Sequence, residues 1–244
     1  MTTSTPERLI TIEGCYNLRD IGGYPARGGT TRWRTLLRSA SPHLMPQASW
    51  GPLAQLGLRT LIDLRRPSEA ERESYHTLVA PPMRYAAMPL FDDRERYVVD
   101  KPANNLGEFY QLALRHCGGQ FRAVIQAIAE DPDPVLVHCA VGKDRTGMVI
   151  LLALGALGVD HETLATDYAM SNALLRPLEE PMRAKMRAQG ADMERFERMM
   201  ESRYEVMIDT LAHLDAEYGG FGGYMEQIGL APATLEKLRQ KLVE

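Results

Sequence analysis

The sequence predicts an α/β fold, with a central and mostly parallel sheet flanked by helices. Short apolar segments typical of strands alternate with helical segments over the first 137 residues. A polar loop at 138–147 then leads into an apolar helix, and the rest of the chain is almost wholly helical. Strands that alternate with helices usually pair in parallel, because each helix carries the chain back across the sheet.

The first predicted elements are two short strands and a helix. Residues 9–12 form a strand candidate, and the glycines within 17–23 favour a turn. Residues 35–39 have the composition of a second strand. In 47–57 the apolar residues recur at helical spacing, and the glycine at the end of this segment marks a helix stop.

A third strand is predicted at 58–64, and its apolar character places it centrally in the sheet. The next segment begins a helix, because Pro67 and early acidic residues are typical of a helix start. The elements that follow are a weaker strand, a charged connection, and two helical stretches divided by a pair of glycines: 84–88, 89–104 and 106–130.

The polar loop 138–147 reads His-Cys-Ala-Val-Gly-Lys-Asp-Arg-Thr-Gly. A turn at 131–134 and a strand at 135–137 precede it. The apolar run 148–154 is predicted as a helix, because a polar loop and a glycine come before it. The loop therefore lies at a helix N-terminus, where unpaired backbone N–H groups and the helix dipole attract an anion.

Cys139 and Arg145 in this loop indicate a nucleophile beside a phosphate site. The guanidinium of Arg145 can hold two oxygens at once, and the backbone N–H groups between the two residues can surround a tetrahedral dianion. The same positive field favours the thiolate form of Cys139. The thiolate would attack phosphorus in line and form a phosphocysteine, which water then hydrolyses.

Beyond the loop, helices are expected at 164–175 and 234–243. The charged segment between them carries apolar residues at helical spacing: Met193, Phe196, Met200, Met207, Leu211 and Leu214. We expect one catalytic domain over 1–244 with a helical insertion at about 174–216. The methionine-rich stripe of the insertion is a core face by default; the alternative is a lid over the loop, because flexible methionines adapt to different surfaces.

The composition is that of a globular protein, since 45% of the 244 residues are hydrophobic and 25% are charged. The net charge of −4 gives no basic field for nucleic acid. Neither an apolar run near the ~18 residues of a membrane span nor an N-terminal signal is present. The expected compartment is the cytoplasm, without stable membrane insertion, although some export routes use no cleavable signal. The oligomeric state is not determined by the sequence.

The three cysteines are too few for a disulfide framework. Cys15 and Cys117 are expected to be packed thiols, and a protective disulfide from either to Cys139 is the alternative. A zinc site at His138 and Cys139 is not expected, because adjacent residues seldom supply two tetrahedral ligands.

The loop 138–147 resembles the signature of the cysteine-dependent protein tyrosine phosphatases, in particular the bacterial atypical branch of tyrosine and lipid phosphatases. Further segments extend the resemblance over nearly the whole chain: 17–23, 61–65, 167–172 and 224–230. The resemblance implies the cysteine-phosphatase fold and a reaction without metal or organic cofactor. The partner that it implies is a phosphorylated protein or a phosphoinositide.

Carried over by position, the resemblance makes Cys139 the nucleophile and Arg145 the residue that binds phosphate and stabilises the transition state. It also assigns the phosphate cradle to the backbone N–H groups of Ala140, Val141, Gly142, Lys143, Asp144 and Arg145. Thr146 is expected to donate its hydroxyl to the sulfur of Cys139. His138 is expected to order the loop by hydrogen bonding.

The proton donor for the leaving oxygen has several candidates. Asp144 is favoured, because some phosphoinositide phosphatases that the loop resembles carry an Asp directly before the Arg. Asp63 comes second, since the carboxyl ends of parallel strands point into the crevice of such sheets. The loop 89–94 offers Asp92 and Asp93, where many family members keep the acid. The acid must be protonated while Cys139 is ionised, so activity should be bell-shaped on the acidic side of neutral.

Lys143 widens the range of expected substrates, because the Gly-Lys-x-Arg arrangement resembles inositol lipid phosphatases, where such a Lys meets an additional phosphate. Phosphotyrosine, phosphoserine or phosphothreonine, and phosphoinositides are all admissible. The expected function is hydrolysis of phosphate monoesters on phosphotyrosine proteins. A binding module that captures phosphorylated partners without turnover is the alternative, and a thiol redox protein is disfavoured because Cys139 has no C-x-x-C partner.

Overall fold

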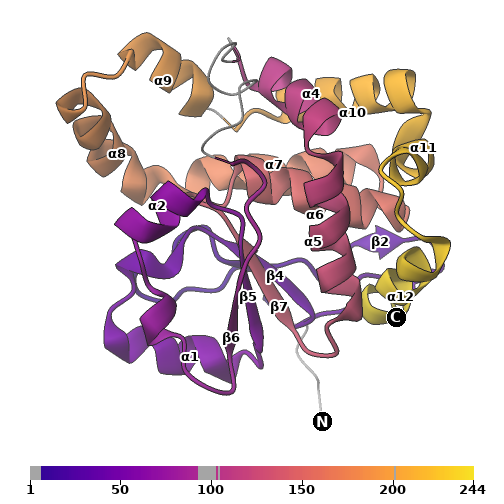
Figure 1. The fold of residues 1–244 in the computed structure, drawn as a ribbon, viewed down its shortest axis with the longest axis horizontal. Helices are drawn as coiled ribbons and strands as arrows, with labels where there is room; N and C mark the ends of the chain where they lie inside the picture. The colour runs from indigo at the N-terminus through magenta and orange to yellow at the C-terminus, as the bar shows by residue number, and fades with distance from the viewer. Residues whose placement is uncertain (1–6, 93–102, 104, 201) are drawn as a thin grey trace.

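A five-stranded sheet forms the centre of the computed structural model, which describes residues 7–92, 103, 105–200 and 202–244 (Figure 1). In spatial order its strands are β1 (Arg19–Asp20), β4 (Leu36–Ser39), β7 (Val135–His138), β5 (Thr60–Asp63) and β6 (Arg84–Ala87). β1 pairs antiparallel with β4, and all the other neighbours are parallel. The predicted α/β fold with a mostly parallel sheet is confirmed, and β7 is its central strand.

The inner strands bury both of their faces, because side chains on a strand alternate between the two sides of the sheet. Leu37, Leu61 and Leu136 are aligned across the sheet and pack in the smaller core, together with Trp50. Their neighbours along the strands pack in the larger core on the opposite face: Leu36, Ile62, Val135 and Val137. Burial on both faces explains why these strands appear in the sequence as continuous apolar runs.

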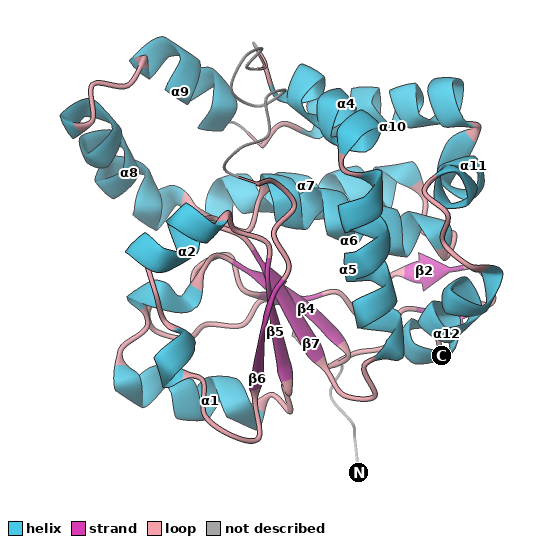
Figure 2. Cartoon of the chain, in the orientation of Figure 1, coloured by secondary structure: helices cyan, strands magenta, loops and turns pink. Residues whose placement is uncertain are grey.

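Helices cover both faces of the sheet (Figure 2). α1 (Trp50–Gln55) packs in the smaller core, and α2 (Pro67–Arg72) follows β5. The larger core is covered by α4 (Leu106–His116), α5 (Gly118–Glu130), α6 (Asp144–Ala156), α7 (His161–Leu174), α10 (Tyr204–Tyr218), α11 (Gly220–Gln227) and α12 (Pro232–Leu242). Short 3-10 turns occupy Pro42–Leu44, Gln47–Ser49 and His76–Leu78, and β2 (Pro25–Ala26) and β3 (Gly29–Thr30) form a separate hairpin.

Two expectations about local structure are wrong. Residues 9–12 are not a strand; Leu9 and Ile12 make only isolated bridges to Arg19 and Cys15. The charged segment after α7 is not one stripe on a core face but three helices: α8 (Arg176–Ala188), α9 (Met193–Met200) and α10. The three helices differ in burial, because α10 buries Met207, Leu211 and Leu214 in the larger core, whereas α9 only packs the partly buried Met199 against it.

The helices α8 and α9 lie at the edge of the molecule, away from α5, α11 and α12 (Figure 1). Leu178 is the buried residue of α8, and α9 buries none of its described residues. Among the described helices, none has the length and apolar character needed to cross a bilayer.

Candidate active site

The ends of three parallel strands meet at one edge of the sheet. The register aligns Ser39 of β4 and Asp63 of β5 with His138 of the central strand β7. Cys139 is the first residue beyond β7, and α6 begins only five residues later, at Asp144. The loop therefore connects the carboxyl end of the central strand to a helix N-terminus, where the sequence predicts it.

Gly142 allows the loop to turn tightly against β4. Its φ of +67° lies in the left-handed region, and a Cβ there would sit 2.0 Å from the Ser39 carbonyl oxygen. Only glycine fits this position, because any larger residue would be strained in φ and would collide with the backbone of β4.

The carbonyl oxygens of the loop are held by donors outside it. Asn17 Nδ2 donates to the oxygens of Val141 and Gly142 at 2.9 and 3.1 Å, and Arg38 Nη2 donates to the Gly142 oxygen at 2.7 Å. The C=O and N–H of a planar trans peptide point in opposite directions. The N–H groups of the same peptide units therefore point away from Asn17 and Arg38. In this orientation they can donate to an anionic oxygen.

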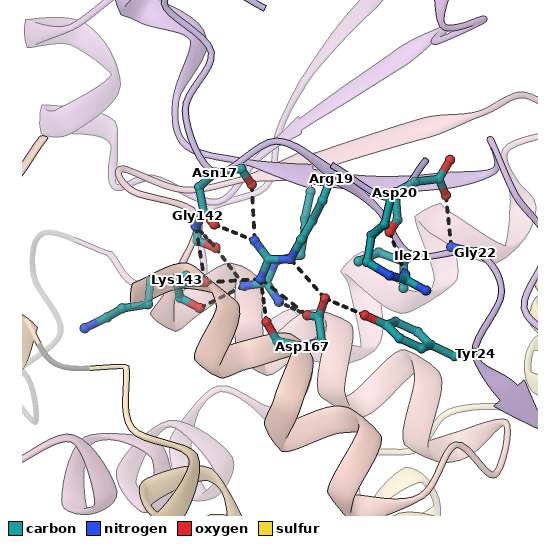
Figure 3. Close-up of polar contacts among 12 residues, drawn as sticks. Asn17, Arg19, Asp20, Ile21, Gly22, Tyr24, Gly142, Lys143 and Asp167 are labelled. Atoms are coloured by element: carbon teal, nitrogen blue, oxygen red, sulfur yellow. Dashed lines mark hydrogen bonds and ion pairs between the residues drawn. The ribbon is translucent and has the colours of Figure 1, made fainter. Parts of the chain in front are cut away.

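A buried charge cluster supports the loop from behind (Figure 3). Asp167 of α7 accepts from Arg19 Nε at 2.9 Å, from Arg38 Nη1 at 2.5 Å and from the Tyr24 hydroxyl at 3.0 Å. Burial alone would raise the pKa of Asp167, but the two guanidinium groups outweigh it and hold this pKa well below its usual range. Asn17, Arg19 and Arg38 therefore position the loop. In the sequence, Arg38 stands out only as a charged residue within the otherwise apolar strand segment 35–39.

His138 is fully buried beneath the loop. Its Nδ1 donates to the carbonyl oxygen of Cys139 at 3.0 Å, and its Nε2 accepts from the hydroxyl of Tyr75. Burial lowers the pKa of His138 to about 4, so that the ring is neutral at physiological pH. A neutral ring with both nitrogens bonded orders the start of the loop.

Arg145 is held in place by Glu69 of α2. Its Nη1 and Nη2 donate to the two carboxylate oxygens of Glu69 at 2.6 and 2.9 Å. Burial alone would raise the pKa of Glu69, but this bidentate contact outweighs it and lowers the pKa. Glu69 also accepts from the Arg66 N–H at the start of α2. The sequence indicates only this helix-start role, so the contact with Arg145 was not predicted.

Asp144 and Lys143 have partners outside the loop. Asp144 Oδ1 accepts from the hydroxyl of Tyr110 at 2.6 Å and lies 3.4 Å from Lys143 Nζ. The Lys143 side chain is only 1% exposed, and its ammonium donates to the carbonyl oxygen of Met199 in α9 at 2.5 Å. The loop is thus tied to the end of α9. Neither Tyr110 nor this contact was predicted from the sequence.

The other candidate acids lie in different surroundings. Asp63 is 1% exposed, with Oδ2 at 2.7 Å from Arg65 Nη2 and 3.0 Å from the Tyr85 hydroxyl. Burial alone would raise the pKa of Asp63, but nearby His138 and Arg65 outweigh it and lower the pKa. Asp92 is exposed, and Asp93 lies outside the described residues. Within the described part of the chain, no group of three His, Cys, Asp or Glu side chains forms a metal site.

Thr146 does not make the expected contact with the sulfur of Cys139. Its hydroxyl is buried and has no hydrogen-bond partner among the described residues, so this expectation is wrong. Thr146 lies in the first turn of α6 and is fully buried. Cys15, Cys117 and Cys139 are all buried, and none of them is in a disulfide with another described residue, as expected for packed thiols at the first two.

A cavity of about 350 Å³ adjoins the loop. Ala140 and Val141 line it from the loop, and Leu178, Met182 and Met186 line it from α8. At its rim, Lys185 of α8 pairs with Glu73, which directly follows α2. These α8 methionines therefore form the wall of a cavity rather than a core face.

The sequence matches known proteins over most of its length. It is 32% identical to a tyrosine-protein phosphatase of Nostoc commune, over 84% of this chain and 73% of the relative. It is 24% identical to the triple specificity protein phosphatase PtpB of Mycobacterium tuberculosis, over 95% of this chain and 98% of the relative. The solved structure of P. aeruginosa TpbA aligns with a TM-score of 0.31 and 19% identity, over 78% of this chain and 95% of that chain.

The model of the tyrosine phosphatase family matches residues 10–244. Because this match includes the loop, the sheet and the helices on both of its faces, the protein is a phosphatase that belongs to the tyrosine phosphatase family.

Proposed function

We propose that the protein hydrolyses phosphate monoesters on phosphotyrosine proteins through a phosphocysteine intermediate. The observation that carries this proposal is the position of Cys139 at the end of the central strand, next to a helix N-terminus and to an Arg145 that Glu69 holds in a bidentate contact. A phosphate group there would meet the backbone N–H groups of 140–145 and a fixed guanidinium. Donors in place before reaction stabilise the transition state without reorganisation.

The reaction takes place in two steps. The thiolate of Cys139 attacks phosphorus, and the bond to the leaving oxygen breaks. The leaving oxygen keeps the electron pair of that bond and receives a proton from Asp144. Water then attacks the phosphocysteine, Asp144 takes the proton of the water, and the S–P bond breaks to restore the thiolate and release phosphate. Arg145 stabilises the phosphoryl oxygens in both steps. No step needs a metal or an organic cofactor.

Asp144 suits the role of proton donor better than Asp63 does. Its side chain is 24% exposed and stands next to Arg145 at the start of α6. Asp63 is enclosed and bound to Arg65, which favours its ionised form. Asp92 remains an alternative donor, together with Asp93 outside the described residues.

The proposed substrate range starts with phosphotyrosine and extends to phosphoserine, phosphothreonine and phosphoinositides. The cavity between the loop and α8 is mostly apolar, which fits an aromatic ring held with its phosphate above Cys139. A relative named for triple specificity supports the wider range. Lys143 would contact an additional phosphate only after its bond to the Met199 carbonyl breaks.

We also propose that the whole chain is one phosphatase domain, with the helical insertion at about 174–216 acting as a lid. α8 forms a wall of the cavity beside the loop, and α9 is tied to Lys143. Movement of α8 and α9 would open this cavity and release Lys143 together. We place the moving part in these two helices, because α10 belongs to the larger core.

The decisive test compares the wild type with Cys139→Ser on a phosphotyrosyl peptide. The wild type should turn over with vanadate sensitivity, and the variant should lose at least about 10⁴-fold in kcat while it still binds the peptide. Wild-type protein that binds phosphopeptide without vanadate-sensitive hydrolysis would instead be a binding module. Rates on phosphothreonyl peptides and phosphoinositides rank the substrates in the same assay, and Lys143→Ala should slow phosphoinositides more than the phosphotyrosyl peptide.

A further inference from the structure

The hydroxyl of Tyr110 lies closest to the proposed proton donor. We infer that Tyr110 is a positioning residue that fixes which oxygen of Asp144 carries the proton for the leaving group. This inference rests on the proposed role of Asp144 as general acid and deepens it.

The contact is short, partly buried and extended by a second tyrosine. Tyr110 of α4 is 0% exposed, and its hydroxyl lies 2.6 Å from Asp144 Oδ1. The hydroxyl of Tyr168 in α7 lies 2.6 Å from that of Tyr110, and the two rings pack edge to face. Three elements, α4, α6 and α7, thus meet at one chain of hydroxyls that ends on the carboxyl group of Asp144.

The direction of the hydrogen bonds follows from chemistry. An ionised carboxylate can only accept, so Tyr110 donates to Asp144 and accepts in turn from Tyr168. Burial raises the pKa of both tyrosines well above the ordinary value, and neighbouring Asp144 raises them further. Both hydroxyls therefore keep their protons over the whole pH range of catalysis, and Asp144 Oδ1 always has its donor.

The two oxygens of Asp144 consequently differ. Oδ1 faces the Tyr110 hydroxyl and also lies nearest to Lys143 Nζ, whereas Oδ2 has no such contact within the described part of the chain. When the carboxyl group is protonated, the proton therefore resides on Oδ2. An acid whose proton is already oriented toward the leaving group needs no reorientation, so the activation free energy is lower.

A purely structural role for Tyr110 is the alternative, since this residue also belongs to the larger core. Tyr224 is a matched control for that role. It is equally buried, and its hydroxyl donates to the carbonyl oxygen of Leu114 in the same helix α4 at 2.9 Å. Tyr224→Phe therefore removes a comparable buried hydrogen bond without touching Asp144.

The test measures how kcat depends on the leaving group. A weakly basic phenolate leaves without a proton, whereas a strongly basic phenolate or an alkoxide needs general acid help. Tyr110→Phe should stay within about twofold of the wild type on a weakly basic aryl phosphate and fall by about 10- to 100-fold on the most basic leaving groups. Tyr224→Phe should retain the wild-type dependence. Thermal melting verifies that each variant is folded.

The double variant separates this inference from the proposed function. In the Asp144→Asn background, Tyr110→Phe should cause no further loss on basic leaving groups, because the donor then has no acid to orient. If Asp144→Asn itself leaves the leaving-group dependence unchanged, the proposed general acid is wrong. If Asp144→Asn has its effect but Tyr110→Phe slows all substrates equally, or adds its loss to that of Asp144→Asn, the inference alone is overturned.

Discussion

The charge cluster behind the loop and the helices α8 and α9 contain similar ion pairs in opposite surroundings. Asp167 lies 2.9 Å from Arg19 Nε, with both side chains no more than 3% exposed. Glu197 of α9 lies 2.8 Å from Arg183 Nε of α8, but these side chains are 46% and 25% exposed. The distances are nearly equal, so burial, rather than geometry, decides what each pair contributes to stability.

The buried cluster tolerates little change. Each of its charges has lost its water of hydration, and only the opposite charges in the cluster offset the free-energy cost of that loss. The loop that it supports is therefore fixed together with the core. The helices α8 and α9 are tied to the rest of the molecule by contacts such as the partly exposed pair of Lys185 with Glu73 and the single hydrogen bond of Lys143 to Met199. Such a segment can shift without loss of the core, which a lid requires.

The largest expected effect tests the energetic side of this comparison. Asp167→Ala leaves Arg19 and Arg38 buried without their counter-ion, so the free energy of unfolding should fall by about 3–5 kcal/mol. Activity should fall as well, since Arg38 also holds the loop. Glu197→Ala is the matched control and should leave the unfolding midpoint unchanged. Urea denaturation of both variants provides the measurement, and equal losses would refute the role given to burial.

A second expected effect concerns pH and comes from His138 beneath the loop. Its pKa is lowered to about 4 from 6.5, so between these values the unfolded chain binds a proton that the folded chain does not. Stability therefore falls as the pH drops from about 6.5 to about 4, by about 3 kcal/mol for this group.

The measurement for His138 is urea denaturation at several pH values between 7 and 4. His138→Asn cannot take up the proton, so its stability should vary less over this range than that of the wild type, even if it is lower at pH 7. His43 also has a lowered pKa, but it is present in both proteins and cancels in the difference. Parallel pH curves for the two proteins would contradict the prediction.

The smallest expected effect concerns the attachment of α8. Lys185→Met removes the ion pair with Glu73 but keeps an unbranched apolar stem beside the cavity. The free energy of unfolding should change by no more than about 1 kcal/mol, because the pair is partly exposed. Hydrogen exchange followed by mass spectrometry should become faster in α8 and stay unchanged in α6. An equal increase in both helices would show that α8 is not an independent segment.

Much of the fold was predictable from local pattern. The apolar runs at 58–64 and 135–137 became the central strands β5 and β7, and 106–130 became the two helices α4 and α5. Residues 9–12 were predicted wrongly, because an alternation of apolar residues does not by itself supply a neighbouring strand. The core-face prediction for the methionine-rich stripe holds for Met207 in α10 but not for Met182 and Met186 in α8, since helical spacing does not show whether a helix faces the core or a cavity.

The candidate reacting groups, Cys139 and Arg145, could be predicted from the sequence because they lie within one short loop whose spacing and flanking elements are local properties. The residues that hold them are visible only in the tertiary structure. Glu69 meets Arg145 across 76 positions, Asp167 meets Arg38 across 129, and Tyr110 meets Asp144 across 34. Contacts over such separations form only when strands pair and helices pack, so no periodicity or motif in the sequence records them.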